Sequence, residues 1–146
     1  MLRLGIIGLS PGNGHPYSWS AIFNGYDPEE MENCGFDSIP QYLEQQDWPG
    51  ASIKGAKVTH VWTQSKVLSE RIARASLIPN VVTDVNEMVL KIDALLLARD
   101  DAERHKEFAA PFLRAGVPVF VDKPPALSIS SLRELYALET SSGKVF

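Results

Sequence analysis

Short apolar runs that end in glycine or polar residues alternate along the chain with segments whose apolar residues recur at helical spacing. Runs of this kind, rich in valine, isoleucine and leucine, predict β-strands, whereas the helical spacing predicts amphipathic helices. The sequence therefore predicts five strands, at residues 2–8, 56–63, 80–84, 92–98 and 117–121.

The helical pattern is clear in three later segments. Ser65 suits the N-cap of a helix that ends near Leu77, because a proline two residues further on disfavours helical geometry. A second segment, residues 101–116, contains Pro111, which removes a helical hydrogen bond and is expected to kink or split the helix. A third helix is expected to begin after the N-cap Ser128.

Strands that alternate with helices predict parallel pairing through right-handed crossovers. We therefore predict a doubly wound α/β fold, in which an open parallel sheet lies between two layers of helices. The 146 residues suit one domain, residues 1–146, around one core. The last three residues, 144–146, again have the character of a strand.

Residues 26–50 interrupt the alternation. They include two short helical stretches but are rich in proline, glycine and acidic residues, so we interpret them as an excursion between the first helix and the second strand. Two interpretations remain open for this segment. It is a solvated connection, or it is a surface for a substrate or partner on which Phe36, Tyr42 and Trp48 form a small apolar patch.

Composition narrows the classes of partner. A net charge of -4 and no basic run argue against nucleic-acid binding. No apolar stretch approaches the ~20 residues of a membrane span, so no membrane association is expected. Cys34 is the only cysteine, which excludes an internal disulfide and a CxxC site and predicts a reducing, cytoplasmic location. We expect no metal site, and we expect Cys34 to be a small buried or half-buried apolar residue.

The glycine-rich stretch GLSPGNGH, residues 8–15, directly follows the first predicted strand. Ligands of open parallel sheets lie beyond the carboxyl ends of the strands, where backbone amides and helix N-termini attract phosphate. The stretch departs from the G-x-G-x-x-G spacing, so phosphate contact and ordinary turn chemistry both remain open. For His15 we expect a hydrogen-bonded or helix-capping role rather than catalysis.

The end of the second predicted strand bears on the choice of cofactor. Thr63, Gln64, Ser65 and Lys66 stand where an aspartate or glutamate would bind the ribose of NAD. Without that carboxylate a 2′-phosphate is not repelled, and Ser65 with Lys66 could bind it, so NADP is preferred to NAD. The alternative is that Ser65 only caps the helix and Lys66 is solvated.

The most informative stretch is VPVFVDKPPALS, residues 117–128. It places Lys123 at the carboxyl end of a strand, where two following prolines restrict the backbone, on the same side of the sheet as the glycine stretch. An ammonium in a dry crevice donates to a developing alkoxide, which serves carbonyl and hydroxyl redox chemistry. On chemistry alone, an exposed lysine in a turn is the competing interpretation.

The chain apart from the excursion resembles the N-terminal domain of the Gfo/Idh/MocA oxidoreductases, and residues 92–128 carry the specific part of the resemblance. In that resemblance Arg99-Asp100-Asp101 occupies a Thr-Pro-like turn, His105 a helix histidine, Gly116 a glycine, and Asp122-Lys123-Pro124 the Glu-Lys-Pro motif. The family implies a Rossmann domain that binds NAD or NADP, with the lysine near the nicotinamide and the substrate. It also implies that His105 orders the helix and loop, and that the residues after 143 begin a sixth strand.

The resemblance also implies which residues form the site. Lys123 is the candidate catalytic residue. The candidate pyrophosphate loop consists of Gly8, Ser10, Gly12, Asn13, Gly14 and His15. Further cofactor contacts are expected from Thr63, Ser65, Lys66, Arg99 and Lys123.

The function implied is that of a nicotinamide-dependent oxidoreductase that acts on a sugar, inositol or related polyol by hydride transfer. We expect the C-terminal substrate domain of such proteins to be missing, so that residues 1–146 alone are inactive and the surface left open favours self-association into a homo-oligomer. The rearranged glycine loop and the acidic turn leave an alternative, a catalytically inactive nucleotide-binding or interaction module of the same fold.

Overall fold

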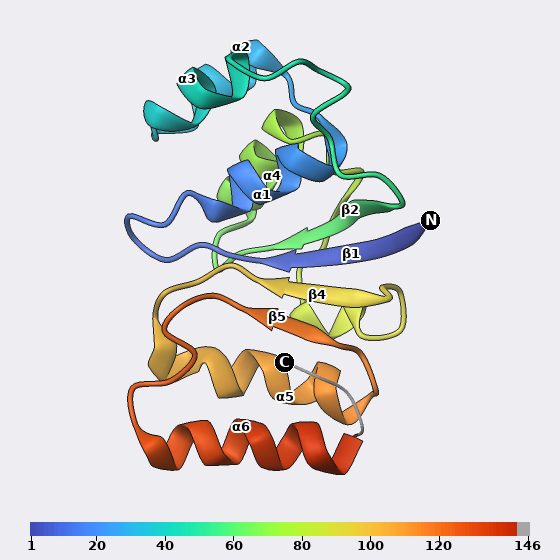
Figure 1. Cartoon of the computed structure of the whole chain (residues 1–146), viewed down its shortest axis with the longest axis vertical. Helices are drawn as coiled ribbons and strands as arrows, with labels where there is room; N and C mark the ends of the chain where they lie inside the picture. Colours follow the sequence, from blue (N-terminus) through green and yellow to red (C-terminus); the bar gives the residue numbers. More distant parts are fainter. Residues whose placement is uncertain (143–146) are drawn as a thin grey trace.

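The computed structural model describes residues 1–142, in which five strands form one parallel sheet (Figure 1). The strand order β3-β2-β1-β4-β5 shows that the chain starts in the middle of the sheet and builds outward on both sides. The predicted doubly wound α/β fold is therefore confirmed. The strands are β1 (Leu2–Ile7), β2 (Ala56–Trp62), β3 (Asn80–Val81), β4 (Ala94–Leu97) and β5 (Val119–Val121).

All five predicted strands exist, but β3 is shorter than predicted. It pairs only through Asn80 and Val81, and Asp84 then caps a short 3-10 turn at Val85–Met88 with its side chain. That turn ends the strand. The predicted strand at residues 144–146 lies outside the described residues.

The carboxyl ends of four strands lie level with one another. Ile7 pairs with Trp62 and with Leu97, and Leu97 pairs with Val121. The four loops that follow these strands therefore emerge at one edge of the sheet, which we call the rim. The rim consists of residues 8–14, 63–65, 98–101 and 122–125.

Helices cover both faces of the sheet, because alternate strand residues point to opposite sides. Ile6 packs in a core with α1 and α4, whereas its neighbour Ile7 packs in a second core with α5 and α6. The three-layer arrangement is thus confirmed. These helices are α1 (His15–Asn24), α4 (Lys66–Ala75), α5 (His105–Arg114) and α6 (Ile129–Ser142), with a short 3-10 turn at Ala102–Arg104 before α5.

The predicted helix signals are confirmed at both caps. The Ser65 side chain accepts from the Leu68 amide at 3.5 Å, and the Ser128 side chain accepts from the Ser131 amide at 3.1 Å. The expected split at Pro111 is wrong, because α5 continues through it to Arg114. A proline late in a helix removes one hydrogen bond, and burial of the flanking apolar residues keeps the helix intact.

The excursion forms two short helices, α2 (Pro28–Glu32) and α3 (Ser38–Glu44), that pack on the core beside α1. Met31 and Leu43 are completely buried there. The segment is therefore more than a solvated connection. Phe36 packs on Tyr17 and Trp48 packs on Tyr26, at ring distances of 6.1 and 5.6 Å, so two of the three side chains of the possible patch have separate aromatic partners.

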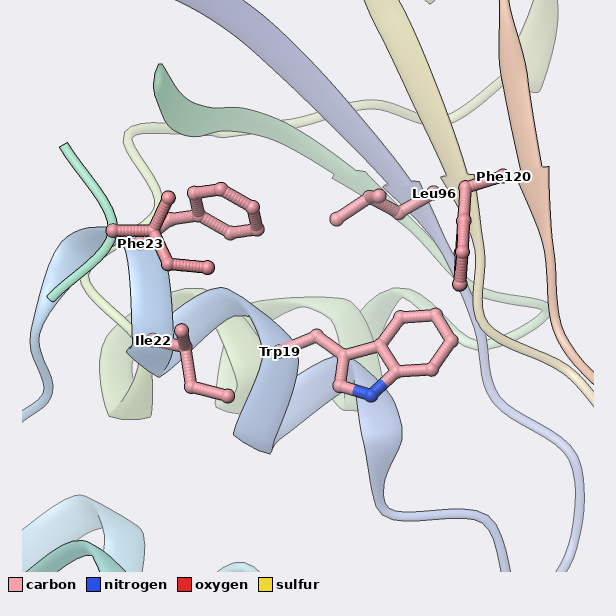
Figure 2. Close-up of a pocket in the computed structure, with 6 residues that line it drawn as sticks. Trp19, Ile22, Phe23, Leu96 and Phe120 are labelled. Carbon is pink, nitrogen blue, oxygen red and sulfur yellow. The ribbon is translucent and has the colours of Figure 1, made fainter. Parts of the chain in front are cut away.

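On the α1 side, β4 and β5 are only partly covered. Trp19, Ile22 and Phe23 of α1 face Leu96 of β4 and Phe120 of β5 across an apolar hollow of about 330 Å³ (Figure 2). Phe120 is 60% exposed. An apolar surface therefore lies between the second half of α1 and the partly covered strands β4 and β5.

Candidate functional site

Asp122 connects the loops that follow β1 and β5. Its Oδ2 accepts from Asn13 Nδ2 at 2.9 Å and lies 2.5 Å from His15 Nδ1, while its Oδ1 accepts from the Lys123 amide at 2.8 Å. Burial raises the pKa of this carboxyl, but the hydrogen bonds outweigh burial and the pKa lies below its ordinary value. Asp122 is therefore a buried, ionised carboxylate that holds two loops together.

Arg99 supplies a buried positive charge at the centre of the rim. Its Nη1 donates to the carbonyl oxygens of Gly8 and Leu9 at 3.1 and 3.3 Å, and its Nε and Nη2 bind Asp101 at 2.7 and 2.5 Å. The guanidinium also lies over the ring of Phe108, 5.2 Å from its centre. Arg99 is only 4% exposed, so the structure places it as a support for the glycine loop.

Two further contacts hold the glycine loop in place. The Gln64 side chain donates to the Leu9 carbonyl at 2.7 Å and accepts from the Leu9 amide at 3.2 Å. The Ser10 hydroxyl donates to the Asp100 carboxylate and accepts from the Asp100 amide. The loop is thus tied to the ends of β2 and β4, and Ser10 has both hydroxyl functions occupied within the protein.

Glycine is required at the three glycine positions of the loop for different physical reasons. A Cβ at Gly8 would lie 2.4 Å from Pro16 Cγ, and one at Gly14 would lie 2.6 Å from Ile39 Cδ1, so both positions are closed by packing. Gly12 is different. It has a φ of +82°, and a Cβ there would have open space around it.

The amides of Gly12 and Gly14 are available for an anion. No described residue accepts a hydrogen bond from either, although the neighbouring Asn13 and His15 amides are bonded within the loop. Both amides lie just before α1, whose N-terminus carries a partial positive charge. Unbonded amides, open space at Gly12 and a helix N-terminus fit the pyrophosphate of a dinucleotide.

At the end of β2, Ser65 caps a helix, which is the arrangement given above as the alternative to binding of a 2′-phosphate. Thr63 is 4% exposed and its hydroxyl donates to the Ser65 carbonyl at 2.7 Å, while Ser65 caps α4. Lys66 is exposed, with Nζ 3.7 Å from the Glu70 carboxylate. Phosphate binding by Ser65 and Lys66 stays a prediction.

Lys123 follows Asp122 at the rim and is exposed. Among the described residues none forms a hydrogen bond or ion pair with its ammonium. His105, by contrast, is completely buried, with Nε2 2.9 Å from the Arg99 carbonyl and Nδ1 3.2 Å from the Pro125 carbonyl. His105 therefore connects the loops after β4 and β5, which is the ordering role expected for it.

The predicted site residues divide into two groups. The side chains in the first group are buried and already bonded within the protein: Ser10, Asn13, Thr63 and Arg99. Gly8 is buried with them as a packing contact. The others lie exposed or half-buried along the rim: Gly12, Gly14, His15, Ser65, Lys66 and Lys123.

Sequence reasoning did not identify the supporting roles of Asp122, Asp101 and Gln64. Asp122 bonds to Asn13 across 109 positions of sequence, and Gln64 bonds to Leu9 across 55. A pattern of neighbouring residues in the sequence cannot reveal pairs that are so far apart. The available signal was position alone, since each residue lies in a loop that follows a strand ending at the rim.

The described part of the chain gives no support for a metal site, a membrane-spanning helix or a reactive cysteine. No three histidine, cysteine, aspartate or glutamate side chains within it gather closely enough to hold a metal ion. Across residues 1–142, no helix has the length and apolar character needed to cross a membrane. Cys34 is half-buried, as predicted, and burial raises the pKa of its thiol, which disfavours the reactive thiolate.

Comparison with known families agrees with this geometry. A family model, Gfo/Idh/MocA, described as an oxidoreductase family with an NAD-binding Rossmann fold, matches residues 34–146. The chain belongs to this family. The predicted Rossmann fold and the Gfo/Idh/MocA resemblance are therefore confirmed, and the family is NAD-binding. The match begins after residue 33, so the interpretation of the glycine loop rests on the geometry above.

Solved structures in this family share the fold. They include scyllo-inositol dehydrogenase from Lactobacillus casei with bound NAD(H) and scyllo-inositol, at 17% identity and a TM-score of 0.67, covering 100% of this chain and 35% of the dehydrogenase. A dehydrogenase from Clostridium difficile has 23% identity and a TM-score of 0.66, covering 99% and 38%. UDP-N-acetylglucosamine 3-dehydrogenase from Acidithiobacillus ferrooxidans has 14% identity and a TM-score of 0.65, covering 99% and 36%.

The chain thus spans little more than a third of the length of these structural relatives. No curated relative matches it. The family and the fold are established by these findings, and the activity belongs to the proposal that follows.

Proposed function

We propose that residues 1–146 are the dinucleotide-binding domain of an oxidoreductase that transfers hydride between NAD(P) and a sugar, inositol or related polyol. The observation that carries this proposal is the rim, where Lys123 and the free amides of Gly12 and Gly14 lie at the carboxyl ends of parallel strands. The strand order reverses between β1 and β4, which is where such sheets bind ligands.

The proposed contacts follow from the exposed group of rim residues. The Gly12 and Gly14 amides bind the pyrophosphate, and Ser65 with Lys66 binds a 2′-phosphate, so NADP is preferred to NAD. A bound nicotinamide supplies the acceptor or donor of hydride. The Lys123 ammonium donates a hydrogen bond to the substrate oxygen as charge develops on it. Arg99, Asn13 and Ser10 keep the loop in the shape that exposes these amides.

The substrate requires polypeptide beyond this domain. The relatives are almost three times longer than this chain, and one of them is described with scyllo-inositol bound. We therefore propose that residues 1–146 alone bind the nucleotide weakly, turn over polyols poorly and occur in the cytoplasm. Efficient oxidation of any polyol by these residues alone would contradict the need for a further domain.

A matched pair of substitutions at Gly12 tests the nucleotide site. Asn and Asp tolerate a positive φ better than other side chains, and the position has open space, so both variants should fold. Gly12→Asp places a negative charge beside the expected pyrophosphate, and Gly12→Asn is the neutral control. We expect Gly12→Asp to bind NADPH and NADH about tenfold more weakly than Gly12→Asn, measured by calorimetry.

The same titrations test the preference for NADP over NAD and the proposed oxidoreductase function. Tighter binding of NADPH than of NADH by the unaltered protein would support the preference for NADP. Equal affinities of the two Gly12 variants would place the pyrophosphate elsewhere. Absence of binding of both nucleotides would contradict the oxidoreductase function.

One observation favours the second candidate, an inactive binding or interaction module of the same fold. The carboxylates of Asp100 and Asp101 lie against the glycine loop and its supporting arginine, where a pyrophosphate would meet like charge. This module would retain the fold and lack affinity for nicotinamide nucleotides, so the same titrations distinguish the two functions.

A further inference from the structure

His15 differs from the other two histidines because a carboxylate binds one ring nitrogen and the other is left open. Its Nδ1 lies 2.5 Å from Asp122 Oδ2, and its side chain is 34% exposed. Among the described residues none bonds to its Nε2. His105 is buried between two carbonyls, and His60 Nδ1 lies 2.9 Å from the hydroxyl of its neighbour Thr59.

The Asp122 contact decides which nitrogen carries the proton. Asp122 is ionised and can only accept, so the neutral His15 ring donates from Nδ1 and keeps a lone pair on Nε2. Asn13 and the Lys123 amide donate to the same carboxylate and fix its orientation. This carboxylate–histidine arrangement prepares a ring nitrogen to accept a proton.

The His15 ring is also held from its face. It stacks on the indole of Trp19, with centres 4.6 Å apart and planes 11° apart. Trp19 in turn meets the ring of Phe120 edge-on at 5.4 Å, at the end of the apolar hollow (Figure 2). The His15 amide donates to Asn13 Oδ1 at 2.9 Å, so backbone and ring are both fixed.

His15 Nε2 and the Lys123 ammonium belong to two residues that Asp122 contacts at the rim. Asp122 binds the imidazole through Oδ2 and the Lys123 amide through Oδ1, so one carboxylate holds both the imidazole and the backbone that carries the lysine. Neither group is used elsewhere by the described residues. An acceptor for a proton and a cation that stabilises an oxyanion are the two groups that oxidation of a hydroxyl needs.

We propose that His15 is the proton acceptor of this site and that Asp122 is its positioning residue, a role that rests on the proposed oxidoreductase function. The substrate O–H bond breaks and its proton forms a bond with Nε2. The electron pair of that bond forms the carbonyl as the hydride leaves the carbon for the nicotinamide. Asp122 stabilises the resulting imidazolium against the N-terminus of α1, and the proton then passes to solvent.

The tautomer and the reactivity of Nε2 are measurable without turnover. In the protein labelled with ¹⁵N-histidine, we expect the neutral His15 ring to carry its proton on Nδ1. Diethyl pyrocarbonate reacts with an unprotonated Nε2, and mass spectrometry follows each histidine separately, with His60 as the internal reference. We expect Asp122→Asn to slow the reaction at His15 about tenfold relative to His60, and Asp122→Glu to restore part of the rate.

A third measurement relates His15 to the nucleotide. We expect saturating NAD⁺ or NADP⁺ to protect His15, and not His60, from the reagent. An Nε2–H tautomer in the unaltered protein would overturn the proposal, even if Asp122→Asn fails to fold. Bound nucleotide without protection of His15 would overturn it and leave the proposed function intact. If calorimetry shows no nucleotide binding, both fall together, and the calorimetry identifies that case.

Discussion

At the scale of single residues, the rim depends on two buried charges of opposite sign. Arg99 holds the carbonyls of Gly8 and Leu9, while Asp122 holds Asn13 and His15. Each is fixed by several hydrogen bonds in a site with little access to water. Removal of one such buried charge leaves its hydrogen-bond partners buried and unpaired. The resulting loss of folding stability is far larger than that caused by removal of an exposed ion pair.

Arg99 and Arg104 form a natural comparison, because both guanidinium groups lie over the ring of Phe108, at 5.2 and 4.7 Å. The Arg99 side chain is 5% exposed and pairs with Asp101, whereas the Arg104 side chain is 42% exposed and pairs with Glu107. We expect Arg99→Met to lower the free energy of unfolding by about 3 kcal/mol and Arg104→Met by less than about 1 kcal/mol. Urea unfolding of both variants measures this difference, and equal losses would contradict the supporting role of Arg99.

At the scale of elements, the excursion is part of the structure that shapes the glycine loop. Gly14 has no room for a Cβ because Ile39 of α3 and Phe36 lie against it. Helix α3 is also one wall of the hollow that Gly12, Gly14 and His15 line. The position of α3 therefore bears on the free amides of the loop, although α3 contributes none of the predicted site residues.

Neighbouring residues of α3 test this packing. Leu43 is completely buried and Tyr42 is 37% exposed. We expect Leu43→Ala to cost about 3 kcal/mol of stability and Tyr42→Ala less than about 1 kcal/mol, in thermal or chemical unfolding. If Leu43→Ala were as mild as Tyr42→Ala, the excursion would be the solvated connection that its composition first suggested.

At the scale of the whole molecule, carboxylates link strands, loops and termini. Arg3 at the start of β1 donates hydrogen bonds to Asp93, which lowers the pKa of that carboxyl to about 2. Burial raises the pKa of Asp101, but the hydrogen bond and charge of Arg99, a backbone hydrogen bond and the charge of Arg104 together outweigh burial, so that pKa also lies below its ordinary value. With Asp122, three such carboxylates favour the folded state in their ionised form.

The sign of the pH dependence follows from these shifts. A carboxyl whose pKa is lower in the folded state stabilises the fold above its unfolded pKa, near 4, and loses that contribution as the pH falls through the folded value. We expect the thermal midpoint to be steady near neutral pH and to fall steadily below pH ~4. Asp93→Asn should make this acid limb shallower. A midpoint that rose on acidification would show that these carboxylates do not support the fold.

The sequence alone determined the alternation of strands and helices, the caps at Ser65 and Ser128, the parallel fold and the position of Lys123 at a strand end. These features depend on residues a few positions apart, where periodicity and turn chemistry act. The continuation of α5 through Pro111 and the packing of the excursion on the core could not be predicted, because contacts with residues distant in the sequence decided both.

Only the tertiary structure decided which rim residues are exposed and which are buried supports of the loop. Arg99 and Asn13 have the chemistry of ligand-binding residues, yet Arg99 donates to the Gly8 carbonyl across 91 positions of sequence and Asn13 donates to Asp122 across 109. His15 became a candidate proton acceptor for the same reason, since Asp122 reaches it across the sheet. Strand-end geometry is local in sequence, but hydrogen-bond partners and burial depend on which distant loops the folded sheet brings together.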